Sequence, residues 1–183
     1  GEGAPGEVVI GAPGQYKWTI SVHGKKAHGG LEPEKGINAI MIAAKALAEV
    51  ERYGRIDEET TCNIGVIGGG VATKVVPDLV VIEGDVRSRN NEKLEAVREE
   101  LVSTICNAVE KFGGKFTAEV EHKYSSFLID TNSTVVKLAE RACALYNLPL
   151  DITQTGGGSD ANFFNAYGVP CVILGTGMKN VHT

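Results

Sequence analysis

The chain has 183 residues, enough for one large domain or two small ones, and its composition is that of an ordinary globular protein. A formal net charge of -5 argues against non-specific binding to nucleic acid, which needs a basic surface. No apolar run is long enough to cross a bilayer, so a membrane role is not expected. The N-terminal segment lacks the basic start and apolar stretch of a secretory signal peptide.

The cysteines and the chain ends carry two further expectations. Cys62, Cys106, Cys143 and Cys171 lie far apart, without a Cys-x-x-Cys pair. That spacing suits neither a zinc knuckle nor a compact disulfide scaffold, and a reducing cytoplasm accounts for it most simply. The chain starts without Met in loop-like residues and stops just after an apolar stretch and a Gly turn, which favours a fragment of a longer protein.

The first part of the chain alternates strand and helix patterns. Apolar and polar residues alternate over residues 17–23, which predicts a half-buried strand. After a Gly-rich loop, residues 37–48 have helical periodicity. The apolar stripe expected to be buried on this helix comprises Ile37, Ile40, Met41, Ala44, Leu47 and Ala48. Two more strands are predicted over residues 60–67 and 77–87.

A second helix is predicted to begin at Asn90-Asn91, whose side chains suit a helix N-terminus, and a fourth strand covers residues 116–121. The order strand, helix, strand, strand, helix, strand is the β-α-β-β-α-β arrangement of a ferredoxin-like α+β domain. We place this domain at residues 13–124 and expect a four-stranded antiparallel sheet with both helices on one face. An edge strand left open in such a sheet predicts a homodimer formed through this domain.

Residues 125–183 have a different pattern, that of a partial α/β segment. A helix is predicted at 134–146, followed by a short strand from Ile152, a Gly-rich turn and a short helix. The helix is expected to bury Val135, Leu138, Ala142 and Leu145. The apolar run 169–174 predicts a strand buried on both faces of a parallel sheet. Residues 1–12 are assigned to the end of a preceding segment of the same domain.

Two side chains in the first part are candidates for chemistry. His28 lies beside Gly29-Gly30, just past a strand, where an exposed imidazole can donate a hydrogen bond to a developing oxyanion. The alternative is a solvated loop histidine. Arg87 lies on the polar side of a strand and can hold a carboxylate through its guanidinium fork. The alternative there is an ion pair with Glu83 or Asp85 on the same face.

The C-terminal part adds a glycine loop and a histidine. Residues 156–160 follow a strand and precede a helix, so their backbone N–H groups can face an anion, although a tight turn alone explains the pattern equally well. The run matches neither the P-loop nor the dinucleotide fingerprint. His182 follows an apolar strand and can bind a metal, but a zinc site needs at least two more ligands close to it.

Taken in order, these segments resemble a known enzyme family. The motifs that carry the resemblance are Ala12-Pro13-Gly14, residues 24–30, residues 33–39, residues 61–65, Gly68-Gly69, residues 75–78, residues 85–88, residues 157–162 and the closing Val181-His182-Thr183. The set covers nearly the whole chain and resembles the dinuclear-zinc peptidases that include peptidase T, carboxypeptidase G and succinyl-diaminopimelate desuccinylase. The segments around His28 and Asp160 are most similar to the peptidase T-like branch.

The resemblance implies a zinc-dependent aminopeptidase, tripeptidase-like, that cleaves an amide bond in a small peptide substrate. In that family an α/β catalytic domain holds two zinc ions, and an inserted ferredoxin-like lid usually forms the homodimer. The matched positions imply that His28 is the lid histidine that stabilises the oxyanion, often across the dimer. They imply that Arg87 binds a substrate carboxylate, that Asn63, Gly157 and Gly158 line the substrate site, and that His182 is the last zinc ligand.

Two departures from the family pattern set the remaining expectations. Lys74 stands where the family usually has Asn, which bears on specificity. The family's other metal ligands and its general-base Glu lie upstream of Gly1, so the chain by itself is expected to bind no catalytic zinc and to be inactive. The alternative function is a non-catalytic dimerisation or ligand-binding module with a ferredoxin-like fold, but the glycine loop and His182 argue against it.

Overall fold

The computed structural model describes residues 3–178 and divides them into two compact units. The larger unit comprises residues 16–86 and 92–123, and the smaller unit comprises the residues up to 15, residues 87–91 and the residues from 124 onward. Each unit has its own apolar core. Within residues 3–178, none of the helices combines the length and the apolar character that crossing a membrane requires.

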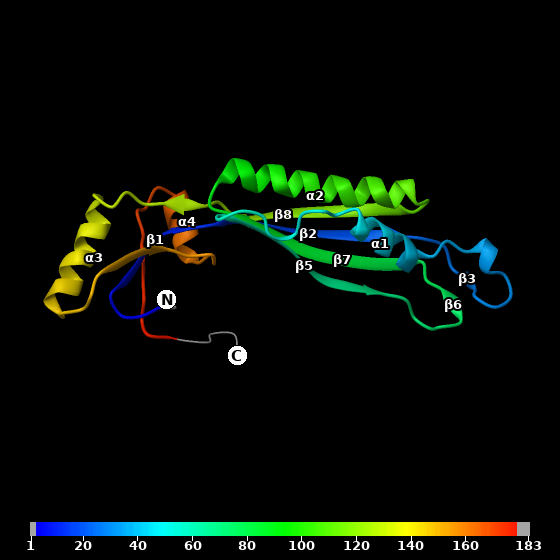
Figure 1. Cartoon of the computed structure of the whole chain (residues 1–183), viewed down its shortest axis with the longest axis horizontal. Helices are drawn as coiled ribbons and strands as arrows, with labels where there is room; N and C mark the ends of the chain where they lie inside the picture. Colours follow the sequence, from blue (N-terminus) through cyan, green and yellow to red (C-terminus); the bar gives the residue numbers. More distant parts are fainter. Residues whose placement is uncertain (1–2, 179–183) are drawn as a thin grey trace. The chain divides into compact units, whose positions relative to one another are not determined.

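The larger unit contains one extended sheet (Figure 1). Its strands follow the order β4 (Gly54–Arg55), β5 (Thr60–Gly69), β7 (Leu79–Ser88), β2 (Gly14–His23) and β8 (Lys115–Tyr124) across the sheet. Four of them are the long strands expected from the alternating sequence. The fifth, β4, is a two-residue addition that pairs antiparallel with the first part of β5 and was not predicted.

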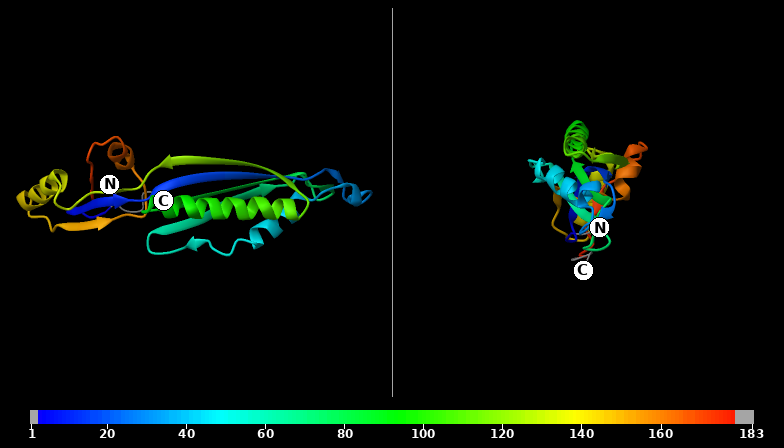
Figure 2. Two further views of the ribbon diagram at one scale, coloured as in Figure 1. Left: turned by 90° about the horizontal axis from the view of Figure 1, so that it is seen from above. Right: turned by 90° about the vertical axis from the view of Figure 1, so that its right-hand side faces the viewer.

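Two helices complete the predicted β-α-β-β-α-β order, namely α1 (Ala39–Ala48) and α2 (Asn91–Lys111). Both contribute to a single core with Trp18, Ile20 and Val22, which share one face of β2, so both helices cover the same face of the sheet. Figure 2 shows α2 running along the length of the long strands. The order of the long strands and helices, and the placement of both helices on one face, therefore agree with the sequence analysis. The predicted four-stranded sheet has five strands instead, because β4 is added to it.

The buried stripe of α1 was predicted incorrectly. The helix buries Ala39, Ile42, Ala43 and Ala46, whereas Ile40 and Met41 are 42% and 54% exposed. Small alanine side chains allow a helix to lie close to a sheet, and this stripe packs against the strands at the expense of the bulkier one. The helix begins at Asn38, whose side chain accepts a hydrogen bond from the Met41 N–H at 3.1 Å.

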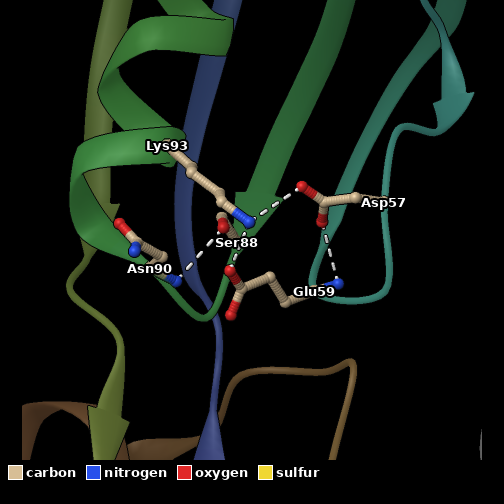
Figure 3. Close-up of polar contacts among 5 residues, drawn as sticks. All are labelled: Asp57, Glu59, Ser88, Asn90 and Lys93. Atoms are coloured by element: carbon tan, nitrogen blue, oxygen red, sulfur yellow. Dashed lines mark hydrogen bonds and ion pairs between the residues drawn. The ribbon is translucent and has the colours of Figure 1, made fainter.

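An ion-pair cluster ties the start of α2 to the loop between β4 and β5 (Figure 3). The Lys93 ammonium lies 3.0 Å from the Asp57 carboxylate and 2.6 Å from the Glu59 carboxylate. The Glu59 N–H also donates to Asp57 Oδ1 at 2.9 Å. That backbone bond, with the Lys93 bond second, lowers the pKa of Asp57 to about 2.

The depressed pKa of Asp57 predicts a pH dependence of folding. Because the folded-state pKa lies below the unfolded value, the stabilisation from this carboxylate is present above about pH 4 and is lost as the pH falls towards 2. Replacing Asp57 with Asn should therefore lower the free energy of unfolding at pH 6 more than at pH 2.5. Denaturant unfolding of both proteins at the two pH values checks this, and an equal difference at both would contradict it.

The smaller unit is built around β1 (Glu7–Ala12). This strand pairs parallel with β10 (Asp151–Gln154) and antiparallel with β11 (Ile173–Leu174) and β9 (Phe127–Leu128). Two helices belong to this unit, α3 (Thr134–Leu145) and α4 (Asp160–Ala166), the second of which carries Phe163 and Phe164 as predicted. The predicted α/β character is found, but the sheet is mixed rather than purely parallel.

The buried stripe of α3 was predicted incorrectly. The helix α3 buries Val136, Ala139 and Cys143 against Val8 and Ile10 of β1, so the predicted stripe is displaced by one residue. Leu138 and Leu145 of the predicted stripe are 56% and 80% exposed.

The run 169–174 is not a fully buried strand either. Only its last two residues form β11, and Val169 and Leu174 are about half exposed. The middle of the run is held to α4 instead, because Asn165 Nδ2 donates to the Cys171 carbonyl at 2.8 Å and the Cys171 N–H donates to Asn165 Oδ1 at 3.1 Å. A backbone bound to a side chain in this way is not available to a strand neighbour.

Candidate functional site

His28 lies in a small two-stranded sheet of the larger unit, whose strands are far apart in the sequence. It ends β3 (Ala27–His28), which pairs antiparallel with β6 (Val75–Val76). The Gly29 N–H extends this pairing by donating to the Lys74 carbonyl at 2.8 Å. The two strands are thus joined by backbone hydrogen bonds as far as Lys74, the position that departs from the family pattern. Those bonds do not depend on the side chain at position 74.

The segments on either side of β3 are also fixed by backbone contacts. Lys25 and Ile37 exchange two hydrogen bonds of 2.9 Å, and the Gly24 N–H donates to the Asp78 carbonyl at 2.8 Å. A Cβ at Gly24 would lie 2.1 Å from the Ile37 carbonyl oxygen, so the close approach requires glycine there. The backbone around His28 is therefore held in place by hydrogen bonds to neighbouring segments.

The His28 side chain is exposed, and its ring has a definite orientation. Its Nδ1 accepts hydrogen bonds from the N–H groups of Gly30 and Leu31, both at 3.2 Å. Nε2 makes no hydrogen bond to any other residue between 3 and 178. The ring is therefore held at one nitrogen and leaves the other without a hydrogen-bond partner among the described residues.

Asn63 lies elsewhere in the larger unit, on β5. It is exposed and lines an open groove together with Glu83 and Asp85 of the neighbouring strand β7 and Lys17 and Thr19 of β2, the next strand across the sheet. These side chains alternate with the core residues and therefore lie on the face opposite to the helices. Between them Gly84 is required, since a Cβ there would lie 2.2 Å from the Asn63 carbonyl oxygen. Asn63 shares no hydrogen bond with His28.

The glycine loop of the smaller unit is organised by one buried side chain, Asn162, which the sequence analysis did not single out. Asn162 Oδ1 accepts from the Ser159 N–H at 2.9 Å, and Ser159 Oγ accepts from the Ala161 N–H, which together form a capping box at the start of α4. Asn162 Nδ2 donates to the carbonyls of Pro13 at 2.9 Å and Ser125 at 2.8 Å. The amide is 1% exposed and joins three chain segments.

The two predicted glycines lie in this loop, just before the capping box. The Gly157 N–H donates to Thr155 Oγ1 at 3.2 Å, so it is already used within the loop. A Cβ at Gly158 would lie 2.3 Å from the Tyr124 ring, and that ring also packs edge-on against Phe163. A side chain at position 158 would therefore require the Tyr124 ring to move.

The remaining predicted residues are placed as follows. Arg87 is half buried near the end of β7, and residues 87–91 belong to the smaller unit. His182 lies outside the described residues. No group of three or more His, Cys, Asp or Glu side chains that could hold a metal ion is found among residues 3–178. The described residues therefore do not fit a catalytic zinc by themselves.

Comparison with known proteins gives several matches that cover the whole of this chain. The chain is 41% identical over 182 residues to the uncharacterised protein YqjE of Bacillus subtilis, covering 100% of this chain and 49% of that protein. It is similar in structure to a tripeptidase from Staphylococcus aureus, with a TM-score of 0.91, 37% identity and coverage of 100% and 48% of the two chains.

An aminopeptidase PepT from Bacillus cereus is also similar, with a TM-score of 0.88, 41% identity and coverage of 100% and 49%. This chain spans about half the length of these proteins. The family model for the peptidase dimerisation domain matches residues 10–112, which include the whole β-α-β-β-α unit up to the end of α2. The chain therefore belongs to the family of M20 peptidase dimerisation domains.

Proposed function

We propose that this chain is the dimerisation lid, with part of the catalytic domain, of a zinc-dependent aminopeptidase that hydrolyses tripeptides. Membership of the peptidase dimerisation family and the similarity to a tripeptidase and an aminopeptidase over the whole chain support the enzyme class. The four free cysteines, three of them buried, suit a protein of a reducing cytoplasm.

The geometry of His28 carries the proposal. Its ring is exposed beside the β3–β6 strand pair, which backbone bonds hold together. Its Nδ1 accepts two hydrogen bonds, and its Nε2 has no hydrogen-bond partner among the described residues. Such a group can donate to the carbonyl oxygen of a scissile amide and stabilise the negative charge that develops there. The solvated loop histidine offered as the alternative would not need two backbone donors on one nitrogen.

The other predicted residues take substrate roles in this proposal. Arg87 would bind the carboxylate at the C-terminus of the peptide, and Asn63 would contact the substrate from the groove on β5. Of the two glycines, Gly158 would offer its N–H, whereas Gly157 must first release Thr155 Oγ1 to do so. His182 would be the last zinc ligand. Zinc, when bound, would supply an activated water.

A small substrate panel tests the enzyme class. The full-length protein that contains this chain, loaded with zinc, is expected to hydrolyse tripeptides with a free amino group faster than the same tripeptides after N-acetylation. Release of the N-terminal residue, followed by chromatography, measures both rates. Faster cleavage of the acetylated peptides would point to a deacylase or carboxypeptidase, and no hydrolysis of any amide would favour the non-catalytic module.

The dimer is proposed to form through the β5 edge of the larger unit. Beyond Thr61–Cys62, where β4 pairs, β5 is an edge strand without charged residues, and Val66 and Ile67 on it are 52% and 57% exposed. Met41 of α1 is exposed as well. The opposite edge, β8, carries Glu119, Glu121 and Lys123, and charged side chains disfavour strand-to-strand pairing.

Analytical ultracentrifugation of the 183-residue chain checks this assignment. The wild-type protein, of 19.4 kDa per copy, is expected to sediment as a dimer at micromolar concentration. Ile67→Glu should convert it to a monomer, because a charge would be buried without a partner in the interface. Val120→Glu, the matched change on β8, should leave the dimer intact. A monomeric wild type, or a Val120 variant that dissociates instead, would contradict the proposal.

A further inference from the structure

The hydrogen bonds around His28 specify more than its orientation. Two N–H groups, from Gly30 and Leu31, point at Nδ1 at 3.2 Å each. A nitrogen that accepts two hydrogen bonds cannot carry a proton of its own, so the proton of the neutral ring must sit on Nε2. In a neutral imidazole one nitrogen donates while the other accepts, and the partner of one fixes the role of the other.

We propose that the Gly30 and Leu31 N–H groups are positioning groups that hold His28 in the Nε2–H tautomer, so that the ring acts as a hydrogen-bond donor and not as a base. This inference rests on the proposed function only for the identity of the acceptor, a carbonyl or carboxylate oxygen of the substrate. The tautomer itself follows from the two contacts in this chain.

The same turn holds the donors in place. The Leu31 and Glu32 N–H groups lie 3.3 and 3.1 Å from the His28 carbonyl, and the Gly29 N–H is bound to Lys74. The turn therefore wraps around His28 through backbone groups alone, and the side chains at positions 29–31 contribute no polar contact to the ring. A role of this kind depends on the backbone N–H groups and not on the side chains. Proline is the one residue that removes it, because proline has no backbone N–H.

Gly30 allows a matched pair of variants. Gly30→Pro deletes one donor to Nδ1, whereas Gly30→Ala keeps the N–H and adds a Cβ at 3.7 Å from the ring, an ordinary contact distance. Both are made in the 183-residue chain. Long-range ¹⁵N–¹H correlation spectra at about pH 8.5, where ordinary histidines are neutral, report which ring nitrogen is protonated. The His28 signals are assigned by their loss in His28→Gln.

The wild-type chain and Gly30→Ala are expected to show His28 only as the Nε2–H tautomer, and Gly30→Pro is expected to show a mixture of both. In the full-length protein Gly30→Pro should lower kcat for a tripeptide about fivefold, as the loss of one neutral hydrogen bond does, with KM nearly unchanged. A mixture or the Nδ1–H tautomer in the wild-type chain would overturn the inference, and that measurement does not require the proline variant to fold.

The spectra also separate this inference from the proposed function. If His28 is a single Nε2–H tautomer that responds to Gly30→Pro, the positioning role stands even where the full-length protein hydrolyses no peptide. If the tautomer is mixed while His28→Ala still abolishes turnover, the positioning role fails and the proposed function stands.

Discussion

Replacing His28 with alanine in the full-length protein is expected to lower kcat for a tripeptide by about a hundredfold or more. Removal of one oxyanion donor has this effect in other hydrolases, because the lost bond is strongest when negative charge develops on the carbonyl oxygen. KM should change less, since the ground-state carbonyl gains little from the same donor. Steady-state kinetics on the purified variant measure both constants.

His23 provides the control for this substitution. His23 is the last residue of β2, and its Nε2 is 3.2 Å from Thr117 Oγ1. His23→Ala removes an imidazole of the same size from outside the β3–β6 strand pair, so kcat should stay within about twofold of the wild type. An unchanged kcat in His28→Ala would mean that His28 is only a solvated loop histidine.

The second large effect is expected at Asn162, on stability rather than on rate. Asn162→Ala would leave the Pro13 and Ser125 carbonyls and the Ser159 N–H without their side-chain partner in a buried site. A buried polar group left unsatisfied costs about 1–3 kcal/mol, so the free energy of unfolding should fall by about 2–4 kcal/mol. Denaturant unfolding of the 183-residue chain, followed by circular dichroism, measures the loss.

Two further variants make the Asn162 test specific. Asn162→Asp keeps an acceptor for the Ser159 N–H but faces a carboxylate towards two carbonyls, and it should be at least as destabilising as alanine. Asn132→Ala changes an exposed asparagine in the same unit and should lie within about 0.5 kcal/mol of the wild type. A loss at Asn162 no larger than at Asn132 would mean that the amide does not organise the glycine loop.

Elements of the larger unit could be predicted wherever the sequence pattern allowed only one interpretation. Strand β2 alternates strictly, and α2 is long enough for its helical pattern to be unambiguous, so both elements were predicted. Helix α1 was different, because two apolar stripes run along it at helical spacing. Which of them is buried depends on how closely the helix approaches the sheet, and that distance is set by side chains from distant strands.

The smaller unit and the candidate site depended more on contacts between distant residues. Strand β1 pairs with β10 about 140 residues later, which local pattern does not reveal. His28 could be singled out from its neighbouring glycines and the family resemblance, but the donors to its ring are backbone groups that any residue except proline would supply. Asn162 was missed because two of its partners are backbone carbonyls of residues far away in the sequence.

Metal content and turnover, measured on the 183-residue chain beside the full-length protein, show whether the zinc site lies outside this chain. We propose that the chain supplies the lid, the dimer contact and the oxyanion donor, while residues 3–178 hold no complete zinc site. After extensive dialysis, the chain should retain no stoichiometric zinc and hydrolyse no tripeptide, whereas the zinc-loaded full-length protein should turn over. Stoichiometric zinc together with measurable turnover by the chain alone would contradict the account.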